Sequence, residues 1–139
     1  MCIRDRLLGY DRVKDKRVLS AAYNDQQGLT AAFNLNMLKV LNSKLKANFI
    51  LDRFKHSAYY DMKQQQIEMR LVAQCTQTIR IEALSSDFKM IQGEEIRTEI
   101  SRKFTMKTMQ ELLEEAKFQI IKTFSSTDDY FSLGLARLA

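Results

Sequence analysis

The stretch that decides the fold is EEIRTEISRKFT, residues 94–105, in which isoleucine alternates with charged and polar residues. Alternation at a period of two is typical of a half-exposed β-strand. It predicts two opposite faces: Ile96, Thr98 and Ile100 on one, and Arg97, Glu99 and Ser101 on the other. A carboxylate and a hydroxyl about 7 Å apart along one face offer an acceptor and a donor. The pattern alone favours a solvated strand face, although the same two groups could bracket a neutral imidazole.

Three shorter alternating runs precede this stretch. They are QIEMRLVA (66–73), TIRIEA (78–83) and SDFKMI (86–91). Short strands at this spacing predict an antiparallel meander of four strands. Gly93 lies at the turn expected before the fourth strand.

Helical periodicity appears on both sides of the predicted meander. KDKRVLSAAYND (14–25) has apolar residues at helical spacing, with Asp15 as the predicted N-cap. A long helix is predicted from Leu29 onward, and TMKTMQELLEEAKF (105–118) predicts a third helix. Thr105 and Thr108 are its candidate N-caps, and Thr108 with Glu111 matches a capping box. The apolar stripe of the long helix comprises Leu29, Phe33, Met37, Leu38, Leu41 and Leu45. The polar residues expected to lie largely off this stripe are Asn34, Asn36, Lys39, Asn42 and Lys46.

The two ends of the chain read differently from its middle. LLGYD (7–11), FQIIKTF (118–124) and YFSLGLARLA (130–139) predict strands around the third helix. The order indicates an α/β fold with an inserted α+β part. Because a strand–helix–strand end has nothing in front of it to complete its sheet, we expect a fragment of a larger protein.

Composition bounds the class of protein. The chain has 139 residues, 45% of them hydrophobic and 28% charged, which suits one ordinary globular domain. No apolar run is long enough for a membrane span, and the cysteines, Cys2 and Cys75, have no metal-binding or redox spacing. We therefore expect a cytoplasmic protein without a membrane partner. The net charge of +5 is spread among 17 acids and forms no basic stripe, so we expect no nucleic-acid partner.

Familiar catalytic patterns are missing from the sequence. The four glycines stand far apart, which excludes a P-loop and a G-x-G-x-x-G loop. The only histidine, His56, lies among aromatic residues, where we expect it to be held by local hydrogen bonds. Tyr23 falls at a helix end beside polar groups, where its hydroxyl can reach a ligand, and Met69 by itself looks like a core or rim residue.

Four segments together resemble the histidine-specific methyltransferases. They are residues 7–42 (LLGYDRVKDKRVLSAAYNDQQGLTAAFNLNMLKVLN), FKHSAYYD (54–61), IEMRLV (67–72) and GEEIRTEISRKFT (93–105). They match family motifs such as A-Y-N-D-x-x-G-x-T-A-x-F-N-x-N and G-E-x-I-x-T-E-x-S-x-K in order and spacing. The resemblance covers residues 7–139.

The resemblance implies both a reaction and a fold. The family uses S-adenosylmethionine to methylate the α-amino group of L-histidine three times, which yields hercynine for ergothioneine biosynthesis. Its fold is a class I, Rossmann-like methyltransferase sheet with a substrate-binding domain. Residues 7–15 and 104–139 would then be an incomplete methyltransferase sheet, residues 16–103 a substrate-binding insertion with an antiparallel sheet, and residues 1–6 a non-native leader. The full-length enzyme is expected to be a monomer.

Four site residues are implied by the matched motifs. Tyr23 resembles the tyrosine that binds the histidine carboxylate, and Met69 resembles a residue that lines the imidazole pocket. Glu99 and Ser101 resemble the pair that hydrogen-bonds the imidazole ring. A site of this kind rejects side chains that leave its polar groups unpaired.

The chain departs from the family because it contains no glycine-rich loop for S-adenosylmethionine. We therefore expect the chain alone to be inactive, with no catalytic residue or metal site of its own. Two alternatives remain open: a family member that acts on another amino acid, such as an indole-bearing one, and a non-catalytic binding module. Glu99 and Ser101 favour imidazole, because an indole offers Ser101 no ring acceptor.

Overall fold

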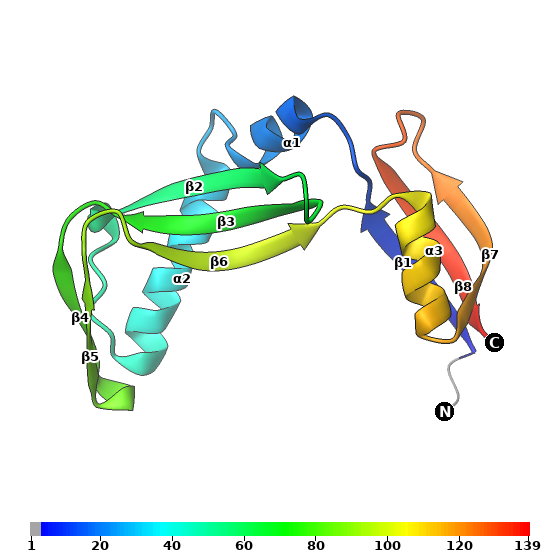
Figure 1. The fold of residues 1–139 in the computed structure, drawn as a ribbon. Coiled ribbons are helices and arrows are strands. Elements are labelled where there is room, and N and C mark those ends of the chain that lie inside the picture. Colours follow the sequence, from blue (N-terminus) through cyan, green and yellow to red (C-terminus); the bar gives the residue numbers. More distant parts are fainter. Residues whose placement is uncertain (1–3) are drawn as a thin grey trace. The chain divides into compact units, whose positions relative to one another are not determined.

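The computed structural model describes residues 4–139, whose helices and strands divide into two units (Figure 1). The terminal unit comprises residues 4–15, 62–66 and 102–139, and the central unit comprises residues 16–61 and 67–101. The expected leader, residues 1–6, lies partly outside the described residues, while Asp5 and Arg6 belong to the first strand. The organisation is mixed α/β, with three small antiparallel sheets.

The terminal unit contains one sheet and one helix. Strands β1 (Asp5–Asp11) and β7 (Phe118–Ser125) flank β8 (Phe131–Leu138), which runs antiparallel to both. The flanking strands β1 and β7 therefore run parallel to each other. Helix α3 (Met106–Glu115) precedes β7, and its Met109 and Leu113 pack with Tyr10 and Ala136.

Helix α3 begins at Thr105, one of its two predicted caps. The Thr105 hydroxyl accepts a hydrogen bond from the backbone N–H of Thr108, and the Thr108 hydroxyl accepts one from the backbone N–H of Thr105. This reciprocal arrangement satisfies two backbone N–H groups at the helix start. The predicted pairing of Thr108 with Glu111 as a capping box is wrong, since Thr108 itself occupies the third position of the box.

A buried lysine ties β1 to the segment before α3 in the same unit. Lys103 is 1% exposed, and its Nζ lies 2.8 Å from the Asp11 carboxylate. Burial acts to raise the pKa of Asp11, but hydrogen bonds from Lys103 and Lys14 outweigh it and hold this pKa below its usual value. The ion pair therefore accounts for the charge that Lys103 carries into the interior.

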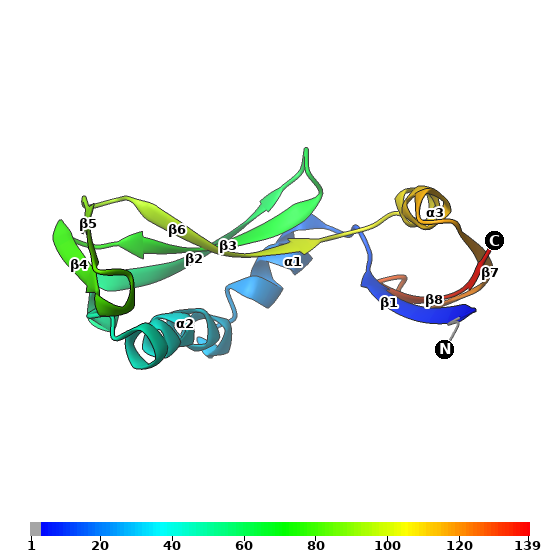
Figure 2. The ribbon, with the colours of Figure 1, turned by 90° about the horizontal axis from the view of Figure 1, so that it is seen from below.

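The central unit packs two helices against one face of a sheet (Figure 2). The sheet has the strand order β2 (Phe54–Asp61), β3 (Gln66–Ala73) and β6 (Glu95–Arg102). Helices α1 (Lys16–Tyr23) and α2 (Leu29–Leu45) supply Leu19 and Leu38, which pack with Met69 and Leu71 respectively from the sheet.

The predicted four-strand meander is wrong in two respects. Strand β2 was not predicted, and β4 (Gln77–Ile81) and β5 (Ser86–Met90) form a separate two-stranded sheet. Strand β6 then returns to pair with β3. Two short 3₁₀ helices, Leu51–Arg53 and Glu82–Leu84, lie before β2 and between β4 and β5.

The apolar stripe predicted for α2 is also partly wrong. Leu38 is fully buried as expected, but Leu29 and Phe33 are each 66% exposed. Asn34, which was expected to lie largely off the stripe, is 3% exposed. The helix turns Asn34 toward the sheet because this side chain finds hydrogen-bond partners there.

None of the helices within residues 4–139 is long and apolar enough to cross a membrane.

Candidate functional site

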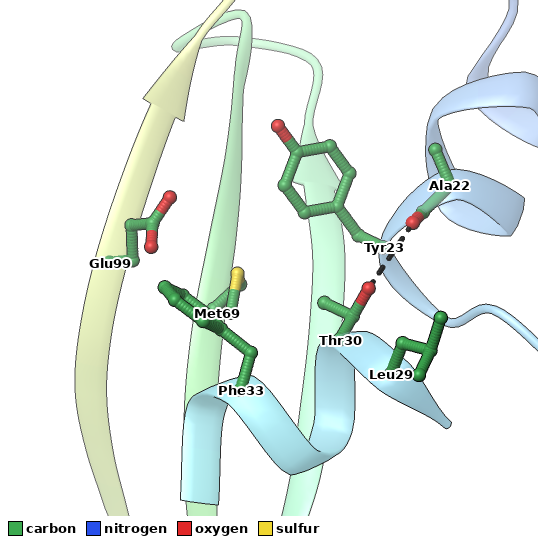
Figure 3. Close-up of a pocket in the computed structure, with 7 residues that line it drawn as sticks. All are labelled: Ala22, Tyr23, Leu29, Thr30, Phe33, Met69 and Glu99. Carbon is green, nitrogen blue, oxygen red and sulfur yellow. Dashed lines mark hydrogen bonds between the residues drawn. The ribbon is translucent and has the colours of Figure 1, made fainter. Parts of the chain in front are cut away.

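A cavity of about 330 Å³ lies in the central unit, at the size expected for a small-molecule site. Helices α1 and α2 and strands β3 and β6 each contribute side chains to it (Figure 3). Its lining residues are Ala22, Tyr23, Leu29, Thr30, Phe33, Met69 and Glu99. Three of the four residues predicted from the sequence, Tyr23, Met69 and Glu99, are thus brought together.

The fourth predicted residue, Ser101, reaches this cavity through Tyr23. The Tyr23 hydroxyl donates a hydrogen bond of 2.8 Å to the Ser101 Oγ. A serine oxygen that accepts a bond in this way still carries one O–H donor of its own. Tyr23 and Ser101 therefore form a polar pair that joins the end of α1 to the end of β6.

Glu99 provides the carboxylate of the site. Within residues 4–139, no hydrogen bond or ion pair of this side chain is found, and its carboxylate points toward Met69 and Tyr23 (Figure 3). A carboxylate without a protein partner in an apolar-walled cavity is a strong acceptor for a ligand N–H. Met69, 2% exposed, forms the floor beside it.

A second cavity of about 200 Å³ adjoins the first. Phe33 and Glu99 line both cavities. Asn34, Asn36, Met37 and Thr98 complete the lining of the second one. The exposed Phe33 side chain therefore lies between the two cavities, and the Glu99 carboxylate is common to both.

A hydrogen-bonded network behind the cavity fixes the backbone of Tyr23. His56 Nε2 lies 2.9 Å from the Tyr23 carbonyl oxygen, so this nitrogen carries the proton and donates. His56 Nδ1 then accepts from the Asn34 side-chain amide at 2.9 Å, and the same amide donates to the Arg70 carbonyl at 3.1 Å. The expectation that hydrogen bonds hold His56 is confirmed, although its partners lie far away in sequence rather than nearby.

The start of α2 is fixed by Asp25, next to the cavity wall. Its carboxylate accepts hydrogen bonds from the backbone N–H groups of Leu29, at 2.8 Å, and Thr30, at 2.9 Å. Hydrogen bonds from Thr30 and then Leu29 lower the pKa of Asp25 to about 2. Gly28 precedes the helix at φ 70°, a left-handed conformation that glycine adopts without strain.

Strand β6 does not keep the simple alternation predicted for it. Arg97 pairs with Glu68, whereas Glu99 lines the cavity beside Met69. Glu68 and Met69 are neighbours in β3 and point to opposite faces of the sheet. Arg97 and Glu99 therefore also point to opposite faces, although two residues apart they were predicted to share one.

The face of Ile100 was predicted wrongly for the same reason. Ile96 packs into the core of the central unit, as predicted, but Ile100 is 45% exposed. The alternation inverts between these two residues, so β6 turns its first half toward the core with isoleucine and its second half toward the cavity with Glu99 and Ser101.

The opposite face of this sheet carries a charge network that is separate from the cavity. Glu68, 5% exposed, accepts from Tyr59 and Arg70 and lies 3.5 Å from Arg97, while Arg70 also pairs with Glu95. Hydrogen bonds to Glu68 and then Glu95 raise the pKa of Arg70. The charged groups of this network are paired with one another, and none of them lines the cavity.

Four cavity residues were not predicted as site residues: Ala22, Leu29, Thr30 and Phe33. Leu29 and Phe33 were assigned to a core stripe because periodicity cannot distinguish a wall of a cavity from a packed interface. The sequence around Phe33, AAFNLN, carries no signal that separates the two cases, because the asparagine after it lies about 100° away around the helix.

The site can hold a small, flat polar group. Glu99 supplies an acceptor, Ser101 a hydroxyl that both accepts and donates, and Met69 and Phe33 supply apolar surface. Within the described residues there is no cluster of His, Cys, Asp and Glu side chains suited to a metal ion.

Comparison with known proteins identifies the family. The family described as histidine-specific methyltransferase, SAM-dependent, matches residues 4–138. The histidine N-alpha-methyltransferase of Mycolicibacterium smegmatis is 41% identical over 130 residues, which cover 94% of this chain and 40% of that protein. The protein of the same name from Mycobacterium tuberculosis is 39% identical over 130 residues, with the same coverage of both chains.

The chain corresponds to only part of each of these relatives. This chain spans about 40% of the length of the curated relatives that it matches. The matched residues include the whole cavity described above, from Ala22 to Glu99. The chain therefore belongs to the histidine-specific, SAM-dependent methyltransferase family.

Proposed function

We propose that this chain forms the L-histidine site of an Nα-methyltransferase. By the full-length protein we mean the polypeptide that carries this chain together with the remaining length found in its relatives. We propose that it trimethylates the α-amino group of L-histidine to hercynine, a step of ergothioneine biosynthesis. The observation that carries the proposal is the Glu99 carboxylate, which has no partner within the described residues and faces Met69 in a cavity of about 330 Å³.

Glu99 and Ser101 are proposed to hold the two nitrogens of the imidazole ring. The Glu99 carboxylate accepts the ring N–H, and the Ser101 hydroxyl donates to the bare nitrogen. Met69 and Phe33 pack against the carbon edge and face of the ring. This arrangement recognises a neutral imidazole by pairing each of its polar groups, which a phenyl ring leaves unpaired.

Tyr23 is proposed to bind the carboxylate of the substrate. Its hydroxyl donates to Ser101 in this structure. On substrate binding it exchanges that acceptor for a carboxylate oxygen, a stronger acceptor. The exchange removes a bond from Ser101, which then turns its own proton to the imidazole.

The described residues do not form a site for S-adenosylmethionine. Such a site needs glycines where a backbone approaches the cofactor closely. A Cβ at Gly9 would lie 2.7 Å from the Phe131 ring, so this glycine serves strand packing, and Gly134 faces Tyr10 inside the sheet. Gly28 and Gly93 lie in turns of the central unit at φ 70° and 88°. We therefore propose that the cofactor, which supplies the methyl group when bound, is held by the remaining length of the full-length protein.

The terminal unit is proposed to be part of a Rossmann-like methyltransferase sheet. Parallel strands β1 and β7 with a helix before β7 suit an α/β sheet whose antiparallel member is β8. The face of the sheet away from α3 exposes large apolar side chains, among them Leu7, Phe124, Phe131 and Leu133. An exposed apolar face of this kind suits burial against further elements.

Substrate identity is tested by methylation assays on the full-length protein. Each amino acid is incubated with S-adenosylmethionine, and products are weighed by mass spectrometry. We expect three methyl groups on L-histidine and none on tryptophan or phenylalanine. Methylation of tryptophan in preference to histidine would favour the alternative of a family member with another substrate.

The role of Glu99 is tested in the same assay. Glu99→Ala is expected to lower kcat/KM for L-histidine by about 100-fold, since a charge-assisted hydrogen bond contributes about 1.5–3 kcal/mol. Affinity for S-adenosylmethionine should stay within twofold. An unchanged kcat/KM would reject the imidazole site.

The chain by itself is proposed to bind no S-adenosylmethionine and to transfer no methyl group. Isothermal titration calorimetry of residues 1–139 with the cofactor tests this statement, and micromolar binding would refute it. If residues 1–139 bind histidine without the cofactor, the chain acts as a binding module, which is the remaining alternative.

We further propose that the full-length protein is cytoplasmic and monomeric. Size-exclusion chromatography with light scattering tests whether it is a monomer.

A further inference from the structure

The inversion of alternation in β6 places Glu99 in the cavity and Ser101 within hydrogen-bond distance of Tyr23, and it requires a specific cause. Glu95 and Arg97 pair with Arg70 and Glu68, on the face away from the helices. With regular alternation, Glu99 would continue on that face and would meet the same charge network. The cavity would then lose the Glu99 carboxylate, and the Ser101 hydroxyl would turn away from Tyr23.

One extra residue in a strand is the usual cause of such an inversion. A β-bulge sets two residues of one strand against one residue of its partner and re-aims the side chains that follow. Arg97 points to one face of the sheet and Glu99 to the other, and Thr98 is the residue between them. Both Thr98 and Glu99 line the second cavity, although they are consecutive residues in the strand.

Thr98 also makes a bond that regular strand pairing does not use. Its hydroxyl donates to the backbone carbonyl of Met69 at 3.0 Å. Met69 is the residue that forms the cavity floor beside Glu99. The hydroxyl therefore ties β6 to β3 beside the inversion and at the residue that the substrate ring is proposed to contact.

We propose that Thr98 is a positioning residue for substrate specificity: its hydroxyl bond to the Met69 carbonyl holds the inversion that turns Glu99 and Ser101 toward the substrate. The inference rests on the proposed function, because it assigns Thr98 an effect only through those two side chains. Thr98 contacts no substrate atom in this role. Without the Thr98 hydroxyl, β6 exchanges between two conformations. In one of them the Glu99 carboxylate lies on the face of the sheet away from the cavity.

The test compares Thr98→Val with Thr98→Ser in the full-length protein. Valine has nearly the shape of threonine but no donor, whereas serine keeps the hydroxyl. We expect Thr98→Val to raise KM for L-histidine about tenfold, the effect of about 1.4 kcal/mol. Affinity for S-adenosylmethionine should stay within twofold, and Thr98→Ser should stay within threefold of the wild type for both. Thr98→Cys, a weak donor, should fall between the two and carries the test if Thr98→Val does not fold.

A mutant cycle with the double substitution Glu99→Ala and Ser101→Ala shows whether Thr98 acts through these two side chains. In that background, Thr98→Val should change KM by less than twofold, because both groups that it positions are already gone. Equal KM values for wild type, Thr98→Val and Thr98→Cys would overturn the inference, as would additive effects in the cycle. If Glu99→Ala alone leaves KM unchanged, the proposed function fails. If Glu99→Ala raises KM and Thr98→Val does not, only the inference about Thr98 fails.

Discussion

At the scale of single residues, the cavity depends on side chains that hold backbone rather than on those that face the ligand. Asp25 accepts from two backbone N–H groups at the start of α2, and His56 donates to the carbonyl of Tyr23. Neither lines the cavity. Each fixes the segment from which a lining residue projects, Thr30 in one case and Tyr23 in the other.

The acid dependence of Asp25 is one prediction at this scale. Its pKa is lowered to about 2 from 3.8, so its stabilising effect is complete above about pH 4 and is lost as the pH falls through about 2. Asp25→Ala should therefore lower Tm at pH 7, and the difference from wild type should shrink steadily below pH 4. Thermal unfolding followed by circular dichroism at several pH values measures this, with Asp52→Ala as the control. A difference that does not depend on pH would contradict the role of the carboxylate.

The buried amide of Asn34 gives a second prediction. Asn34→Leu removes the donor to the Arg70 carbonyl and to His56, and leaves buried acceptors without partners. We expect the free energy of unfolding to fall by about 1–3 kcal/mol. Asn36→Leu on the same helix is the matched control, because Asn36 is exposed. Urea unfolding measures both, and equal stability of the two variants would contradict the network.

At the scale of elements, the single helix α2 serves two surfaces. Its later half packs Leu38 into the core, while its first turns place Leu29 and Phe33 in the cavity wall. Strand β6 divides in the same way, with Ile96 in the core and Glu99 in the cavity. Both elements therefore connect a half that packs in the core to a half that lines the cavity.

The two halves of α2 predict opposite effects of truncation. Leu38→Ala should lower the free energy of unfolding by about 2–5 kcal/mol, because it leaves a hole in a fully buried site. Phe33→Ala should cost far less stability, since its side chain is 66% exposed, but it should raise KM for L-histidine in the full-length protein. Denaturant unfolding and steady-state kinetics separate the two effects. A large loss of stability in Phe33→Ala would place this residue in the core instead.

The elements also show how far sequence patterns reach. The helices and most strands were predicted because apolar periodicity follows local backbone geometry. Strand β2 was missed although Phe54, His56, Ala58 and Tyr60 alternate, because aromatic and polar side chains interrupt its apolar face. The separate β4–β5 sheet and the inversion at Thr98 depend on pairing between strands, which no single strand encodes.

The candidate site followed a similar division. Motifs singled out Tyr23, Met69, Glu99 and Ser101, and the fold brings three of them into one cavity and connects the fourth by a hydrogen bond. Periodicity alone favours a solvated strand face for Glu99 and predicts that Glu99 and Arg97 point to the same face. Their binding roles stay predictions.

At the scale of the whole molecule, the terminal unit exposes apolar surface on one face of its sheet. Phe124 and Phe131 are 47% and 45% exposed there, and Phe131 covers Gly9. Isolated proteins with such faces tend to associate. The chain expressed alone should therefore self-associate.

Substitution on that face should reduce the association. Phe124→Lys places a charge within the exposed apolar face, whereas Leu112→Lys places one on α3 at a similar exposure of 42%. Sedimentation velocity of residues 1–139 should show less association for Phe124→Lys than for Leu112→Lys or the wild type. A monodisperse wild-type monomer that unfolds cooperatively would contradict the prediction that this apolar face causes self-association.

The claim that Glu99 and Ser101 hold the two imidazole nitrogens is tested most directly by NMR of ring-¹⁵N-labelled L-histidine bound to the full-length protein. We predict two distinct ring resonances, one protonated and one accepting. Glu99→Ala should shift mainly the protonated nitrogen, and Ser101→Ala mainly the accepting one. Ring resonances that neither substitution moves would contradict the assignment of this cavity to the imidazole of histidine.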